Sequence, residues 1–249
     1  SHQEIRAILS PFDLRENIQS TGDKGVIIRM RDITEETHLK IVKKLNERAE
    51  VVKAKTSFQS IGPMIGKELK HKTNIVILLA LVAILLYMTF AFRKVSYPVK
   101  SWQYGIAGII ALFHDVLIPI GVFSVLGKFY GIQVTIPIIT ALLTIFGYSI
   151  NDTVVVFDRI RENLLKRTDM DFEGTVDRSL NETLTRSIST SFTTLLVLFA
   201  IFFFGGETLK YFSLALIIGI AAGTYSSIFL ASPMLVFWFR RKNKNFPQS

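Results

Sequence analysis

One acidic residue, Asp152, interrupts a long apolar stretch, within the run GYSINDTVVV that begins at Gly147. An ionised carboxylate in hydrocarbon costs about 2.5–3.5 kcal/mol on insertion scales, so such a residue usually belongs to an ion path or has a charged partner. Arg186, near the start of the next apolar stretch, is a candidate partner. The pair predicts binding and release of a small cation, a proton or sodium, inside a membrane.

Polar side chains accompany both residues. Tyr148 and Ser149 share a helical face with Asp152, and Asn151 precedes it. The stretch after Arg186 is rich in hydroxyl groups, namely Ser187, Ser189, Thr190, Ser191, Thr193 and Thr194. Two such helices facing each other would form a polar seam that holds water, in which Asp152 binds and releases a proton. Since arginine stays charged, Arg186 would act by approaching or leaving the carboxylate.

A structural interpretation of this pair is also open. Asp152 and Arg186 would then form a static salt bridge that locks two helices, or Arg186 would extend to the lipid headgroups. A second polar insertion, His114-Asp115, lies in an earlier apolar stretch. It predicts either an auxiliary proton site or, as we favour, a polar contact between helices.

Signatures of enzymes are missing from the sequence. There is no Walker loop, HExxH motif or dinucleotide fingerprint, and no cysteine for a thiolate metal site. We therefore expect no catalytic activity, no metal site and no cofactor other than the coupling ion. An ion gradient or a partner protein must then drive any work.

Membrane-spanning helices are needed to position these residues. The 249-residue chain is 49% hydrophobic, and five stretches reach the length of about 20 apolar residues that crosses a bilayer. Within a transmembrane domain of residues 74–240, we expect spans at 74–92, 102–126, 134–157, 183–204 and 209–239. In the last span, Gly219 and Gly223 form a GxxxG pattern that favours close packing. The predicted fold class is an all-α membrane helical bundle.

Basic residues are distributed unevenly between the connections. The connections 93–101 and 158–182, with the C-terminal residues from Arg240 on, carry twelve Lys and Arg, whereas on the other side there are only Lys128 and, at the start of the last span, Lys210. The positive-inside rule places the basic segments, including the tail 241–249, in the cytoplasm. Because the number of spans is odd, residues 1–73 are expected on the opposite side. The net charge of +9 thus reflects topology and does not indicate nucleic-acid binding.

The N-terminal residues 1–59 are charged and contain no spanning stretch. A short helix is expected at Ile5–Leu9, a strand at Gly25–Arg31, a helix capped by Thr34, and a returning strand at Val51–Phe58. This order predicts a small extracytoplasmic α+β domain of ferredoxin-like type.

Residues 60–73 predict an amphipathic helix that leads into the membrane. Ser1-His2-Gln3 does not resemble a signal peptide, since it lacks an apolar core. An extracytoplasmic domain needs a segment that carries it across the membrane, so we expect a sixth span before residue 1.

The residues Gly147–Asn163 (GYSINDTVVVFDRIREN) closely resemble the signature of the SecF family of protein-export membrane subunits. Supporting matches are His114-Asp115, Thr183–Arg186 with the Ser/Thr run that follows, Phe204–Gly206 and Gly223–Ser227. The resemblance covers most of the chain and implies the resistance-nodulation-division superfamily, with six spans and an outer domain between the first and second.

The resemblance further implies work beside the SecYEG translocon, together with SecD, in the bacterial cytoplasmic (inner) membrane. Such subunits use the proton-motive force, or sodium in some members, to promote export of unfolded preprotein. Two family positions important for ion conduction map onto Asp152 and Arg186, while a further essential Asp belongs to SecD. The partners expected are therefore SecD, SecYEG, preprotein and membrane lipids, and no nucleic acid.

Two other functions remain open. An ion-coupled small-molecule or lipid transporter of the same superfamily would need a larger outer region with an apolar cleft than residues 1–73 offer. A non-transporting membrane scaffold would use the polar residues only to hold helices together, and ion-dependent activity would distinguish it from both transporters.

Overall fold

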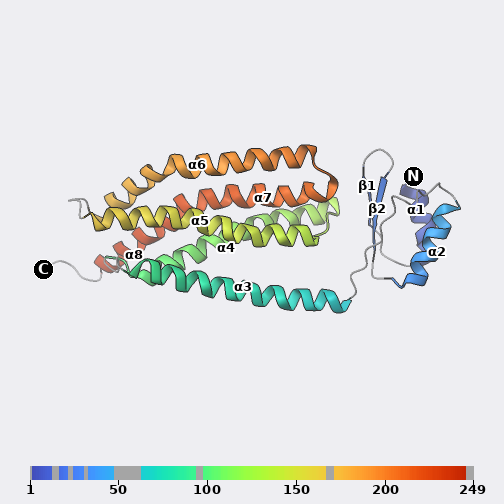
Figure 1. Cartoon of the computed structure of the whole chain (residues 1–249), viewed down its shortest axis with the longest axis horizontal. Helices are drawn as coiled ribbons and strands as arrows, with labels where there is room; N and C mark the ends of the chain where they lie inside the picture. The colour runs from blue at the N-terminus through green and yellow to red at the C-terminus, as the bar shows by residue number, and fades with distance from the viewer. Residues whose placement is uncertain are drawn as a thin grey trace. The chain divides into compact units, whose positions relative to one another are not determined.

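The computed structural model describes residues 2–12, 17–21, 25–30, 33–47, 63–93, 98–166 and 171–244. The chain divides into two compact units, Ser1–Val76 and Ile77–Ser249. The boundary falls within one long helix, α3 (Pro63–Ala91). Figure 1 shows the elements of both units.

The N-terminal unit combines two helices with a β-hairpin. Its elements are α1 (His2–Leu9), a 3-10 turn (Ser10–Phe12), β1 (Asn17–Thr21), β2 (Gly25–Arg29) and α2 (Glu35–Asn46). β1 and β2 are antiparallel, with Ile18 opposite Ile28. Leu9 and Ile41 are buried at the centre of a small apolar core. The expected N-cap is confirmed, because the Thr34 hydroxyl accepts a hydrogen bond from the Thr37 backbone N–H.

The ferredoxin-like arrangement is not shown by the described residues. Their sheet has two strands, paired as a hairpin, and the strand expected at Gly25–Arg31 ends at Arg29. The returning strand expected at Val51–Phe58 lies outside the described residues. From Pro63 on, the amphipathic helix expected at 60–73 and the first expected span form one continuous helix, α3. Pro63 suits the first position of a helix, where its missing N–H leaves no bond unmade.

The membrane unit confirms the expected helical bundle. Besides α3 it contains α4 (Ser101–Tyr130), α5 (Ile136–Leu165), α6 (Phe172–Phe204), α7 (Glu207–Ser226), the π-helical turn η4 (Ser227–Ala231) and α8 (Ser232–Lys244). Among the described residues, five helices are long and apolar enough to cross a membrane, the last formed by α7, η4 and α8 together. At about 1.5 Å per residue, α4, α5 and α6 exceed the hydrocarbon thickness of about 30 Å, so their ends extend beyond it.

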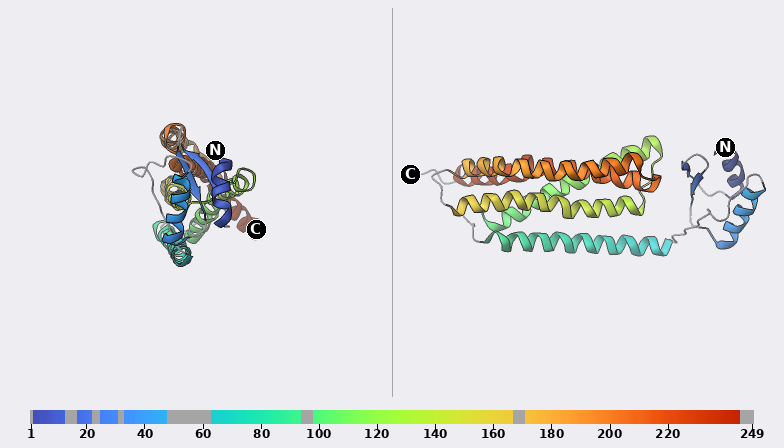
Figure 2. Two further views of the ribbon diagram at one scale, coloured as in Figure 1. Left: turned by 90° about the vertical axis from the view of Figure 1, so that its right-hand side faces the viewer. Right: turned by 45° about the horizontal axis from the view of Figure 1, so that its top comes forward.

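α5 and α7 form the centre of this bundle, with α4 and α6 packed against them. α3 is the least buried of the five spans and runs along the edge of the bundle in both figures (Figure 2). Close packing of α7 on α5 depends on the GxxxG pattern. A Cβ atom on Gly219 would overlap the Ile145 side chain, and one on Gly223 would lie 3.3 Å from Ser149 Cβ.

Two apolar clusters fill the bundle and leave a polar layer between them. One cluster contains Ala111 of α4, Ile160 of α5 and Leu235 of α8, and the other contains Phe123 of α4 and Ile145 of α5. Between these positions lie the buried side chains of Asp115 on α4 and of Ser149, Asp152 and Thr153 on α5. The polar layer is therefore shielded from both ends of the bundle by close-packed hydrocarbon.

Candidate functional site

Asp152 lies in this polar layer and is 8% exposed. The Ser187 hydroxyl, on α6, donates a hydrogen bond of 2.7 Å to Oδ1. The Ser227 hydroxyl, the first residue of η4, donates one of 2.7 Å to Oδ2. The carboxylate of α5 therefore joins two further helical segments, and each of its oxygen atoms has one hydroxyl donor.

Arg186 does not pair with Asp152 in this structure. The residue is exposed, and within the described part of the chain no carboxylate lies at ion-pair distance from its guanidinium. Successive residues of an α-helix point about 100° apart, since a turn takes 3.6 residues. Because Ser187 faces Asp152, its neighbour Arg186 faces away. The expected ion pair is thus replaced by a neutral hydroxyl donor.

Asp115 is a second carboxylate in the polar layer and is fully buried. Its Oδ2 atom accepts hydrogen bonds from the hydroxyls of Ser149, on α5, and Ser226, at the end of α7, the latter 2.7 Å long. Its Oδ1 atom lies 2.9 Å from His114 Nδ1. Asp115 of α4 therefore contacts both central helices.

Consecutive serines, Ser226 and Ser227, contact the two carboxylates. They lie at the junction of α7 with the π-helical turn η4. π-helical turns are rare and frequently occur at functional sites. Each hydroxyl also has a backbone acceptor within reach, Gly223 O at 3.2 Å for Ser226 and Thr224 O at 3.1 Å for Ser227. One hydroxyl hydrogen can serve only one acceptor at a time, so each serine has two alternative bonds.

These serines were not singled out as site residues from the sequence, although they belong to the Gly223–Ser227 match. A pair of adjacent hydroxyls in an otherwise apolar segment is the signal that points to them. Their partners lie 111 and 75 residues away in the chain, which sequence spacing does not reveal.

The other predicted residues are divided between the site and the surface. Tyr148 donates a 3.3 Å hydrogen bond to Ser191, which in turn shares a short hydrogen bond with Thr224. Asn151 is exposed, and exposed Thr190 donates to the backbone oxygen of Arg186 on its own helix. The polar seam is therefore narrower than the sequence indicates, because several hydroxyls of α6 bond within that helix.

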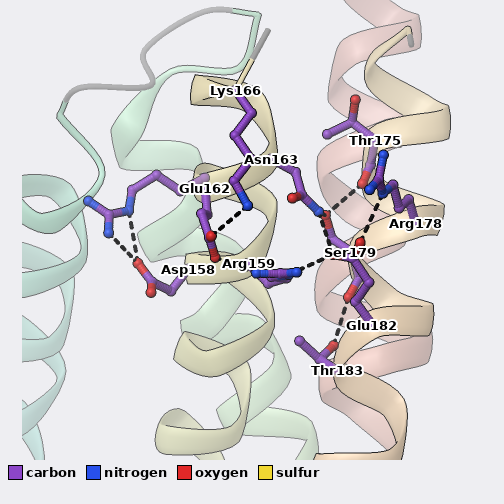
Figure 3. Close-up of polar contacts among 11 residues, drawn as sticks. Asp158, Arg159, Glu162, Asn163, Lys166, Thr175, Arg178, Ser179, Glu182 and Thr183 are labelled. Carbon is purple, nitrogen blue, oxygen red and sulfur yellow. Dashed lines mark hydrogen bonds and ion pairs between the residues drawn. The ribbon is translucent and has the colours of Figure 1, made fainter. Parts of the chain in front are cut away.

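A second polar network ties the ends of α5 and α6 beside the connection between them (Figure 3). Glu182 is its centre. Its carboxylate accepts from Arg159 at 2.6 Å, Asn163 at 2.8 Å and Arg178 at 2.9 Å, and Asn163 also donates to Ser179 at 3.0 Å. This network fixes α5 against α6, a few turns from Asp152.

No group of three or more His, Asp or Glu side chains that could hold a metal ion occurs in the described ranges. The site is therefore built from carboxylates and hydroxyls, with one imidazole beside Asp115. Carboxylates and imidazole bind and release protons, and the chain is therefore a multi-pass membrane protein with titratable groups in its interior.

Comparison with known proteins places this membrane protein in a family. Residues 41–241 match the family described as "Protein export membrane protein SecD/SecF, C-terminal". The chain belongs to this SecD/SecF family.

Individual relatives agree with this assignment. The "Protein translocase subunit SecF" of Thermobaculum terrenum is 45% identical over 247 residues, 96% of this chain and 74% of that protein. The "Protein translocase subunit SecDF" of Thermus thermophilus is 45% identical over 184 residues, 74% of this chain and 23% of that protein. A crystal structure of SecDF in its "Super-membrane-facing form" matches with a TM-score of 0.67 and 33% identity, covering 98% of this chain and 32% of that chain.

Proposed function

We propose that this protein is a SecF-type subunit of the Sec translocase that promotes protein export, driven by an ion gradient acting on Asp152. The observation that carries the proposal is a buried carboxylate with hydroxyl donors and no cationic partner among the described residues, in a chain of this family. The role is transport and not catalysis. SecD is the expected partner, since the Thermus thermophilus relative named SecDF contains in one chain a region similar to this protein.

Protonation of Asp152 would rearrange its hydrogen bonds. As a carboxylate it accepts from Ser187 and Ser227, and such charge-assisted bonds are roughly twice as strong as neutral ones. With a proton on Oδ2, the acid would donate to the Ser227 oxygen, and the Ser227 hydrogen would turn to Thr224 O. The π-helical turn η4 would therefore make different hydrogen bonds in the two protonation states of Asp152. A two-state mechanism requires such an element.

Arg186 would act in the second conformation. It precedes Ser187 on α6, so a rotation of this helix by about one residue, roughly 100°, would bring the guanidinium towards the ionised carboxylate. A charge moved through 100 mV gains about 2.3 kcal/mol. The gradient could thereby exchange a neutral hydroxyl donor for a cation, and α6 would transmit the movement along the bundle.

Export measurements test the role of Asp152. Inverted membrane vesicles depleted of SecD and SecF would be supplied with SecD and the full-length protein, either wild type or Asp152→Asn, at matched abundance. We expect Asp152→Asn to lose the part of preprotein export that depends on the gradient and to keep the remainder. Asp158→Asn is the matched control, because Asp158 lies on the same helix and pairs with Arg161 away from the site. Undiminished gradient-dependent export in Asp152→Asn would refute the proposal and favour a structural role.

The membrane topology is the second part of the proposal. The distribution of Lys and Arg supports residues 1–73, including a ferredoxin-like domain, outside the cytoplasm and the C-terminus within it, in the cytoplasmic (inner) membrane. The chain has no cysteine, so single cysteines report accessibility directly. The cells used would have an intact cytoplasmic membrane and a permeabilised outer envelope. In such cells a membrane-impermeant maleimide should label Glu47→Cys but not Arg241→Cys. The reverse pattern would overturn this topology.

A further inference from the structure

Asp115 is a second buried carboxylate whose charge is not balanced by lysine or arginine among the described residues. It is fully buried, and its one ionisable contact is His114, whose Nδ1 lies 2.9 Å from Oδ1. Burial of an unpaired carboxylate is so costly that the group usually becomes neutral or acquires a charged partner. Asp115 must therefore be either a neutral acid or the partner of an imidazolium. These two states differ only in the position of one proton.

The groups packed around Asp115 are polar but, apart from His114, not basic. α5 contributes Ser149, and Tyr148 and Asp152 are its neighbouring titratable residues. α7 contributes Ser226 and the bare Cα of Gly223, where a Cβ would lie 3.4 Å from Oδ2. Both central helices thus contact the Asp115 carboxylate through hydroxyl groups and a glycine. Among these neighbours, His114 is the group that can exchange a proton with it.

His114 connects this interior group with the surface of the bundle. Its side chain is 34% exposed, whereas that of Asp115 is not exposed. It opens onto an apolar groove along α4 lined by Leu117, Ile118 and Gly121, and its ring stacks on Tyr225, with the centroids 6.4 Å apart. A purely structural contact would be complete with the two serines, which already satisfy Oδ2. The imidazole adds a contact at Oδ1, across which a proton can pass between His114 Nδ1 and the carboxylate.

The two carboxylates depend on the same turn of helix for their donors. Ser226 serves Asp115 and can turn to Gly223 O, and the next residue, Ser227, serves Asp152 and can turn to Thr224 O. When one serine exchanges its carboxylate acceptor for the backbone acceptor, the local backbone shifts. Because the two serines are adjacent, this shift also moves the other serine. On α5, Ser149 and Asp152 lie one helical turn apart, which connects the same two groups by a second path.

We propose that His114 and Asp115 form a second proton-binding site, coupled to Asp152 through the Ser226-Ser227 junction. The proton moves from imidazolium Nδ1 to carboxylate Oδ1 and leaves a neutral imidazole and a neutral acid. The state of this dyad then sets which bond Ser226 makes and thereby the position of Ser227 at Asp152. The coupling rests on the proposed role of Asp152, whereas proton binding at Asp115 does not.

Infrared difference spectroscopy of the purified full-length protein with SecD, in lipid, tests proton binding directly. Protonated carboxyl groups have a C=O band that ionised groups lack, so a pH titration shows which groups exchange protons. We expect Asp115→Asn to lose one titrating carboxylic band that Asp152→Asn keeps. Asparagine retains an oxygen acceptor for Ser226, and folding is checked by the intact amide spectrum. If Asp115→Asn retains every titrating band of the wild type, the second site does not exist.

Export assays test the coupling. We expect Asp115→Asn and the milder surface variant His114→Gln each to lose gradient-dependent export at matched abundance. Ser213→Ala is the control for a substitution at a fully buried polar side chain, because Ser213 is as buried as Asp115 but its described hydrogen bonds go to backbone oxygens of its own helix, α7. Normal export in both variants, despite the lost band, would overturn the coupling. Normal gradient-dependent export in Asp152→Asn would instead reject the proposed function and leave the band assignment of Asp115 standing.

Discussion

Replacing Gly219 by alanine would place a methyl group where α7 meets α5 most closely. The new Cβ would lie inside van der Waals distance of Ile145 Cδ1, 2.5 Å from Cγ1 and 3.1 Å from Cγ2. Carbon atoms prefer separations of about 3.5–4.0 Å. Ile145 is 1% exposed, so it has no free space to enter, and α7 must move away from α5. Overpacking of this kind costs about 1–3 kcal/mol.

The displacement would reach the candidate site. Gly219 precedes Ser226 and Ser227 by about two turns of the same helix, and these serines contact Asp115 and Asp152. We therefore expect Gly219→Ala to lower the free energy of unfolding by about 1–3 kcal/mol and to weaken gradient-dependent export. Unfolding is measured by titrating the protein in mild micelles with a denaturing detergent.

A compensating variant tests whether the overlap with Ile145 is the cause of the lost stability. Ile145→Ala removes the three atoms that the methyl group would meet and by itself should cost about 2–5 kcal/mol. In the double variant the methyl group occupies the vacated space, so the loss should be smaller than the sum of the single losses by about 1–3 kcal/mol. Gly147→Ala on α5 is the control, since no atom lies within 4 Å of its Cβ position. Strict additivity, or an equal loss in Gly147→Ala, would refute the reasoning.

Two further substitutions have clear expectations. Ser227→Ala removes the donor to Asp152 Oδ2, and a hydrogen bond to a charged group is worth about 1.5–3 kcal/mol. Gradient-dependent export should fall in Ser227→Ala but not in Ser213→Ala, and equal export in both variants would contradict the role of the hydroxyl. Tyr104→Phe removes a buried hydroxyl that has no hydrogen-bond partner within the described structure, so detergent titration should show a gain of about 1 kcal/mol; a loss of stability would reveal a partner.

Hydropathy was sufficient to predict the five spans, because crossing a bilayer requires a fixed length of apolar helix. The helices themselves are longer than the predicted spans. The span expected at 183–204 belongs to α6, which begins at Phe172, since a helix is held by its backbone bonds and continues into water where polar side chains such as Glu182 find partners. Local signals were also reliable, as the N-cap at Thr34 shows.

Contacts between helices could not be predicted in the same way. Asp152 and Arg186 flank one connection and reach similar depth, yet the carboxylate meets Ser187. One residue along a helix changes the direction of a side chain by about 100°, and loop length does not fix the rotation of a helix about its axis.

The sequence by itself determined the apolar lengths, the interior ionisable residues and the family, because these depend on residue type and order along the chain. The tertiary structure decided which donor meets which carboxylate. Close packing of α7 on α5 at Gly219 sets the rotation of α7, and that rotation brings Ser226 to Asp115 and Ser227 to Asp152. Such contacts join residues far apart in the chain, so they follow from the packing of side chains across the whole bundle.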